Sequence, residues 1–218
     1  KMEYNDAVRL FVQRAKRARL EFQLSDENLA AVLDICKLVD GSPLGIELAA
    51  VWLRSLTPAD LLQEIKKSMD GLETPSHNIV GRHQSLRAVF EHSWNLLKPK
   101  EKTALAKLSV FIGGFSREAA GQVAEATIPI LTSLVDKSLL KVNADGRYER
   151  HALLYQFAHE KLLAHPELHQ KMQQKHLAYF VTLAEEIAPK LIGSEQALWL
   201  GRVQIELDNF RAASAFAI

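Results

Sequence analysis

Apolar residues recur at helical spacing along almost the whole chain, and this periodicity constrains the fold more than any other feature of the sequence. The clearest example is residues 86–97, where the apolar side chains occupy the i, i+3 and i+4 positions of one helix face. The pattern changes at residues 139–150, where two short strand-like segments flank the turn-forming sequence Asn143-Ala144-Asp145-Gly146. The sequence therefore predicts a mainly α-helical protein with a small β-hairpin.

Interruptions of the helical pattern divide the chain into three predicted domains. Residues 71–81 contain glycine, threonine, proline and serine and break the periodicity, and a further helix ends near Pro166. We expect a helical bundle over residues 1–78, a winged-helix domain over residues 79–164, in which helices precede the hairpin, and the start of a TPR-like helical region over residues 165–218. Two long antiparallel helices in that last region are typical of the first unit of a helical-repeat array.

The composition excludes several classes of function. The 218 residues are 48% apolar, enough to fill hydrophobic cores, and the net charge of +1 gives no general attraction to nucleic acid or membrane. No apolar run reaches the roughly 20 residues that span a bilayer, and no signal peptide is visible, so we expect a cytoplasmic protein without a membrane partner. The one cysteine, Cys36, lies on an apolar helix face, which predicts a buried thiol without a disulfide.

Residues 41–50 predict a turn that enters a helix, with Ser42 as the cap and Pro43 at the first helical position. This segment resembles the G-x-P-L-A-L-E-L-A-A segment of NB-ARC-type STAND ATPases. Residues 82–94 resemble the start of the winged-helix domain that follows in bacterial members, and Arg150-His151-Ala152 resembles their M-H-D-type motif. The three motifs occur in the order of the family and cover nearly the whole chain.

The resemblance implies a nucleotide switch in a longer parent protein. It implies that Pro43 lies against the adenine of ADP or ATP and that His151 contacts the β-phosphate of ADP and holds the closed state. Residues 1–78 would be the ARC-like lid over the nucleotide, and exchange of ADP for ATP would permit oligomerisation. Arg150 replaces the methionine of the motif and Ala152 its aspartate. The residues themselves leave open a plain helix start at Pro43 and a capping or core histidine at position 151.

The chain lacks the residues that a nucleotide-hydrolysing enzyme needs. No G-x-x-x-x-G-K-[ST] motif is present, so the backbone cradle and the lysine that bind phosphates are missing. We therefore expect no catalytic residues, no enzyme activity and no tightly bound nucleotide in this segment. We expect its partners to be a P-loop domain before it and helical repeats after it. The eight histidines show no zinc-type spacing with cysteines or carboxylates, and we expect no metal site.

The predicted winged helix offers few groups that can read DNA. Its third helix, residues 128–137, holds one cation and one anion and is otherwise largely apolar, and the hairpin adds only Lys141, Arg147 and Arg150. We therefore expect no direct contact with DNA. The basic run within residues 5–20 is explained by a solvated face or by contact with a missing domain.

The sequence as a whole favours the regulatory part of a bacterial STAND signalling ATPase or transcriptional regulator, relaying nucleotide state to a helical-repeat sensor. Four residues near the C-terminus resemble the W…E-x-x-N-x-R-A opening of TPR-like regions in such regulators: Trp199, Glu206, Asn209 and Arg211. Two alternatives remain open, a winged-helix DNA-binding regulator with a helical dimerisation tail and a protein-interaction scaffold.

Overall fold

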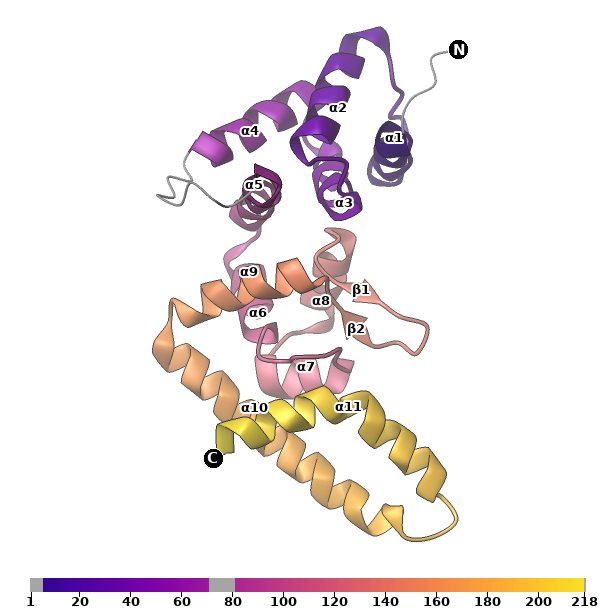
Figure 1. Ribbon diagram of the computed structural model, residues 1–218, viewed down its shortest axis with the longest axis vertical. Coiled ribbons are helices and arrows are strands. Elements are labelled where there is room, and N and C mark those ends of the chain that lie inside the picture. The colour runs from indigo at the N-terminus through magenta and orange to yellow at the C-terminus, as the bar shows by residue number, and fades with distance from the viewer. Residues whose placement is uncertain (1–5, 71–80, 218) are drawn as a thin grey trace. The chain divides into compact units, whose positions relative to one another are not determined.

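The computed structural model describes residues 6–70 and 81–217 and consists mainly of helices (Figure 1). The predicted mainly α-helical class is confirmed. The contacts define two compact units, one of Lys1–Leu97 with Asp136–Ser138 and the other of Lys98–Val135 with Leu139–Ile218. Within the described residues, every helix is too short or too polar to cross a membrane.

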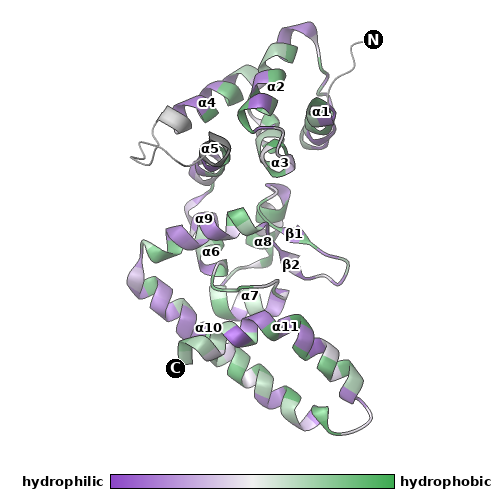
Figure 2. Ribbon diagram, viewed as in Figure 1, coloured by the Kyte–Doolittle hydropathy of each residue, from purple (hydrophilic) through white to green (hydrophobic). Residues whose placement is uncertain are grey.

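The first unit is a bundle built around one apolar helix. Its elements are α1 (Asp6–Ala18), α2 (Asp26–Leu38), α3 (Pro43–Val51), the 3₁₀ helix η1 (Trp52–Arg54), α4 (Pro58–Asp70) and α5 (Gly81–Asn95). Helix α3 packs against α1, α2 and α5, and seven of its nine residues are buried. Figure 2 shows α3 as mostly hydrophobic, which explains its central position.

Two polar contacts fix the helices around this core. Arg14 of α1 donates to Glu47 of α3 at 2.8 Å, so the polar side chain in the middle of α3 is paired. The indole N–H of Trp52 donates to the hydroxyl of Ser93 in α5 at 3.1 Å, in a buried position. Apolar burial places the helices together, and these contacts specify which residues face each other.

The second unit begins with the element order of a winged helix. Its first elements are α6 (Pro99–Leu108), α7 (Arg117–Ala124), α8 (Ile128–Asp136) and the strands β1 (Lys141–Val142) and β2 (Tyr148–Glu149). The strands are antiparallel, with Lys141 opposite Glu149. Phe115 and Tyr148 exchange two backbone hydrogen bonds of 3.0 and 2.9 Å, which extends the pairing beyond the hairpin.

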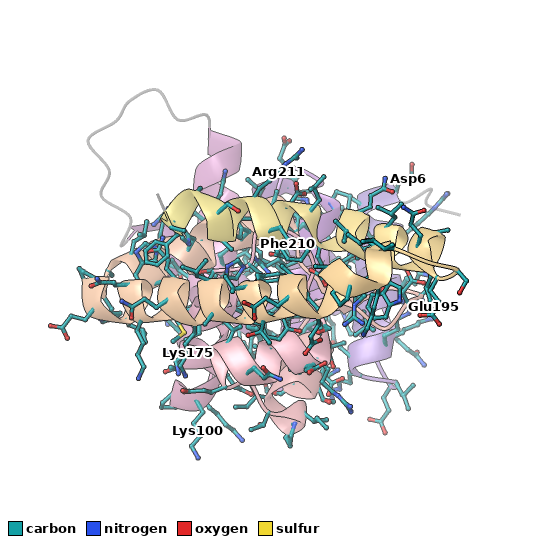
Figure 3. All side chains as sticks on the ribbon, turned by 90° about the horizontal axis from the view of Figure 1, so that it is seen from below. Asp6, Lys100, Lys175, Glu195, Phe210 and Arg211 are labelled. Atoms are coloured by element: carbon teal, nitrogen blue, oxygen red, sulfur yellow. The ribbon has the colours of Figure 1, made fainter. Side chains whose placement is uncertain are left out.

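Three long or medium helices complete this unit. They are α9 (Ala152–Leu163), α10 (Pro166–Ile187) and α11 (Gln196–Ala217), with the 3₁₀ helix η2 (Ala188–Leu191) between the last two. Helices α10 and α11 run back along each other in the second unit, and α10 also packs on α7 (Figure 1). Phe210 lies between α10 and α11, with its ring centroid 5.3 Å from that of Phe180 (Figure 3).

Helix α5 groups by its packing with the first unit, although the sequence analysis assigned it to the winged helix. The winged-helix order is contained in α6 to β2. The predicted boundary at residues 78/79 lies outside the described residues, and the boundary at 164/165 coincides with the short connection between α9 and α10. Both boundaries stay predictions.

We expect Ser93→Ala to destabilise the first unit by about 1–3 kcal/mol, because it leaves the buried indole N–H of Trp52 without an acceptor. Urea unfolding followed by circular dichroism measures the change. Ser68→Ala is the matched control, because the Ser68 hydroxyl donates to the carbonyl of Glu64 in its own helix and does not link two helices through this bond. Equal effects of the two substitutions would contradict a stabilising role for the hydrogen bond from Trp52 to Ser93.

Candidate functional site

Pro43 occupies the first position of α3, as predicted, and its side chain is exposed. The hydroxyl of Ser42 accepts a hydrogen bond from the backbone N–H of Gly45 at 3.4 Å and caps the helix. The preceding turn places Gly41 at a φ of 65°, a left-handed conformation that suits glycine. The local sequence is therefore sufficient to form this helix start, and it leaves the proline ring accessible to a ligand.

Gly45 departs from the alanine of the family segment, and the structure gives a reason. A Cβ atom at this position would lie 2.8 Å from Cβ of Val39 and 2.9 Å from Cδ2 of Leu86. Such contacts are too short for a real side chain, so glycine lets α3 approach its neighbours closely.

A cavity of about 270 Å³ adjoins the turn before Pro43. Cys36 is among its lining residues, and the thiol is almost fully buried, as the sequence predicted. Burial raises the pKa of Cys36 to about 11, so the thiol is protonated at neutral pH and is a poor nucleophile.

His151 forms the N-cap of α9 and is exposed. Its Nδ1 atom accepts a hydrogen bond from the backbone N–H of Leu153 at 3.2 Å. Because Nδ1 accepts, the neutral ring carries its proton on Nε2, which is the atom that can donate to an incoming group. His151 thus has the capping role that the sequence left open for it. Pro43 belongs to the first unit and His151 to the second.

Arg150, which replaces the methionine of the family motif, points into the second unit. It donates from Nη2 to the carbonyl of Phe111, and its guanidinium lies 4.9 Å from the ring centroid of Tyr155 and 5.6 Å from that of Phe115. Burial lowers the pKa of Arg150 to about 10, so the group remains charged at neutral pH. This charge is held by carbonyl and aromatic groups inside the unit.

Arg147, at the end of the hairpin turn, binds α11. Its Nη1 atom donates to Oε1 of Glu206, and its Nη2 atom donates to the carbonyl of Gly114 at 2.8 Å. The Arg147 and Glu206 side chains are only 15% and 8% exposed. The pair is therefore shielded from water and bridges two elements that are far apart in sequence.

Asn209 completes this contact with all of its amide atoms. Nδ2 donates to the carbonyl of Gly114 and to Oε2 of Glu206, both at 3.0 Å, and Oδ1 accepts from the N–H of Ile112 at 3.1 Å. We call these five residues, Ile112, Gly114, Arg147, Glu206 and Asn209, the α11 latch. It fastens α11 to the hairpin and to the loop that follows α6.

Three members of the α11 latch already stood out in the sequence, but in two separate contexts. Arg147 was considered as a hairpin cation for DNA, and Glu206 and Asn209 as part of a repeat-like motif. The i, i+3 spacing of Glu206 and Asn209 puts both residues on one face of a helix and could have indicated a shared polar contact there, although not its partner Arg147.

Helix α8, the predicted reading helix, presents little that can contact bases. Leu131 and Leu134 are buried, and Ser133 donates to Oε1 of Glu101 at 2.6 Å. Residues Ile128–Asp136 include no arginine, lysine, asparagine or glutamine. With Arg147 and Arg150 bound inside the unit, most of the cationic groups considered for DNA are already engaged.

The histidines do not converge on a metal ion in the described part of the chain. The ring centroids of His159 and His169 are 5.5 Å apart, but no group of three or more histidine, cysteine, aspartate or glutamate side chains there has a geometry that could hold one.

Comparison with known proteins finds similar segments in larger bacterial proteins. A Mycobacterium tuberculosis H37Rv protein named "Putative HTH-type transcriptional regulator" is 33% identical over 223 residues, covering 98% of this chain and 25% of the relative. An uncharacterized protein of the same strain is 34% identical over 169 residues, covering 72% of this chain and 43% of the relative. The regulatory protein AfsR of Streptomyces coelicolor is 32% identical over 150 residues, 63% of this chain and 14% of AfsR.

Nearly the whole of this chain therefore matches the mycobacterial regulator, but it spans only about a quarter of that protein's length. No protein-family profile matches the sequence, and no solved structure matches it. The similarity relates this chain to bacterial regulatory proteins and leaves the mechanism to be argued from its own residues.

We expect Asn209→Ala to destabilise the second unit by about 2–4 kcal/mol, because it leaves the N–H of Ile112 and the buried carboxylate of Glu206 without this partner. Arg211→Ala is the control from the same motif, since its side chain is 71% exposed, and we expect a change within about 0.5 kcal/mol. Thermal unfolding compares the two. Similar shifts would show that the α11 latch does not hold α11.

Proposed function

Because the chain is similar over nearly its full length to part of a protein named as an HTH-type transcriptional regulator, we propose that it is the regulatory segment of a bacterial transcriptional regulator acting in the cytoplasm. In this proposal the segment is a STAND-type switch module without enzyme activity of its own. A P-loop domain elsewhere in the longer protein supplies the phosphate contacts, and helical repeats continue beyond α11.

The α11 latch is the observation that carries this proposal. Arg147 of the latch binds α11. Soon after it in the chain, Arg150 binds the carbonyl of Phe111 and His151 caps α9, so these three contacts are made from a stretch of five residues. A displacement of α11 by the helical repeats would therefore act on the segment that ends at His151. This short path supports a role in relaying a signal between the repeats and the nucleotide.

We propose that Pro43 and His151 contact ADP in the longer protein, at the adenine and the β-phosphate respectively. Both side chains are exposed, and the Nε2–H of His151 is the donor that a phosphate would accept from. Loss of these contacts on exchange for ATP would release the closed state and permit oligomerisation.

Direct DNA reading by the winged-helix elements is the second candidate. The name of the mycobacterial relatives, HTH-type transcriptional regulators, and the element order from α6 to β2 favour it. The composition of α8 and the internal pairing of Arg147 and Arg150 weigh against it. The switch proposal uses the internal contacts of Arg147 and Arg150, whereas DNA reading by these two arginines would require that the contacts be broken.

We expect the purified chain to show no sequence-specific DNA complex at about 150 mM salt, because nonspecific phosphate contacts weaken steeply with salt and few base-reading groups remain. Selection from a random-sequence pool, followed by a mobility-shift assay of the selected DNA, covers every possible target sequence. A specific shift that survives at this salt concentration would favour the second candidate.

In the full-length protein, we expect His151→Asn to speed ADP release by roughly 10- to 150-fold, the effect of losing a hydrogen bond to a charged group worth about 1.5–3 kcal/mol. Asparagine is a good N-cap, so this variant keeps the cap of α9 while removing the ring. His165→Asn, at another exposed histidine that begins α10, is the control. Unchanged ADP release in a stably folded His151→Asn protein would leave His151 with its capping role alone.

A further inference from the structure

A half-open cavity of about 210 Å³ lies within the second unit, among α9, α10, α11 and the loop after α6. Its lining combines polar and apolar side chains. The polar ones are three imidazoles and an amide: His159, His169, His176 and Gln173. The apolar and aromatic ones include Val110, Ile112, Tyr155 and Phe216. This mixed lining fits a small molecule that carries both a polar group and an apolar body.

His176 contributes a buried polar atom without a hydrogen-bond partner to the lining of this cavity. Its side chain is 2% exposed and its ring lies against Phe111 and Phe180, with centroid distances of 5.3 and 4.6 Å. Its Nε2 atom is buried and has no hydrogen-bond partner among the described residues. A buried polar atom without a partner costs about 1–3 kcal/mol, so its position at a cavity calls for a group that bonds to it.

The titratable side chains of the lining favour an anionic group over a cationic one. The lining residues include three imidazoles and no carboxylate. Burial, then the nearby His169, and also the charge of Arg150 lower the pKa of His159. Burial lowers the pKa of His176 to about 4, while Asn209 and the carboxylate of Glu206 act in the raising direction. A positive charge is unfavourable on these rings as long as nothing negative enters the cavity.

We propose that this cavity binds a small organic anion, a carboxylate on a compact apolar body such as an aromatic ring. The carboxylate accepts hydrogen bonds from the imidazoles, and the ring packs on Ile112, Tyr155 and Phe216. The cavity is smaller than the roughly 300–1,000 Å³ of sites for drug-sized ligands, which limits the ligand to about one ring. This inference does not depend on the proposed nucleotide switch.

Binding of such an anion is coupled to proton uptake. The free rings of His159 and His176 are neutral near pH 7 because their pKa values are lowered, and the bound carboxylate raises these two pKa values by favouring the protonated ring. Between the free and the bound pKa, affinity falls as the pH rises, by up to about tenfold per pH unit for one proton. Affinity for benzoate is therefore greater at pH 6 than at pH 8.

Titration calorimetry of the purified chain with benzoate tests the site. We expect binding at pH 6 that weakens at pH 8, and at least about tenfold weaker binding of benzamide, which has the same shape without the charge. His169→Gln removes one half-buried imidazole and is expected to weaken benzoate binding about tenfold or more. His165→Gln changes an exposed histidine that does not line the cavity and leaves binding unchanged.

The NMR resonances of the histidine rings show where benzoate binds. Addition of benzoate is expected to shift the ring signals of His159 and His176 and to leave those of His165 in place. The proposal is overturned if benzoate fails to bind at millimolar concentration, if benzamide binds equally well, or if His169→Gln and His165→Gln behave alike while both remain folded by circular dichroism. Because no nucleotide is used, these results are independent of ADP binding by the longer protein.

Discussion

The arrangement of the second unit depends on the buried contact of Arg147, Glu206 and Asn209. Helix α11 carries apolar residues on several sides, and Leu198, Ile205 and Leu207 remain exposed even though the helix is packed. Hydrophobic burial therefore does not by itself determine which side of α11 faces α10 and the hairpin. The polar contacts do, because a rotated helix would leave the charge of Arg147 without the carboxylate of Glu206 and the N–H of Ile112 without its acceptor on Asn209. We infer that the α11 latch fixes the rotation of α11.

The sequence predicted those parts of the fold that depend on neighbouring residues. Ser42 and Pro43 begin α3, and Ser116 begins α7, because a hydroxyl cap acts on an N–H three residues further along the chain. The hairpin turn is fixed in the same way, since Oδ1 of Asn143 accepts from the N–H groups of Asp145 and Arg147. Helix existence followed from periodicity, which is also a local property.

The contacts that define the candidate site are not local. Arg147 and Glu206 are 59 residues apart, and Asn209 and Gly114 are 95 residues apart. Nothing in the spacing of either segment indicates the other, so Arg147 was treated as a surface cation. The packing of α5 could not be read from the sequence for a related reason, because an apolar stripe does not specify its partner and only the contacts with α3 and α4 group this helix with the first unit. The contact of Pro43 and His151 with nucleotide rests on resemblance and stays a prediction.

The buried character of the α11 latch also bears on how a signal can pass through it. An ion pair that has lost its water is stable only while both partners are in place, since separating them leaves an uncompensated charge in a poorly hydrated site. The contact therefore favours two states, docked and released, over a series of intermediate positions. If helical repeats continue beyond α11, as proposed above, an array that pulls on α11 would have to break the contacts of Glu206 and Asn209 with the hairpin and with the loop after α6 together. In that proposal, a gradual change in the array would be converted into a discrete change at the hairpin, which lies immediately before His151 in the chain.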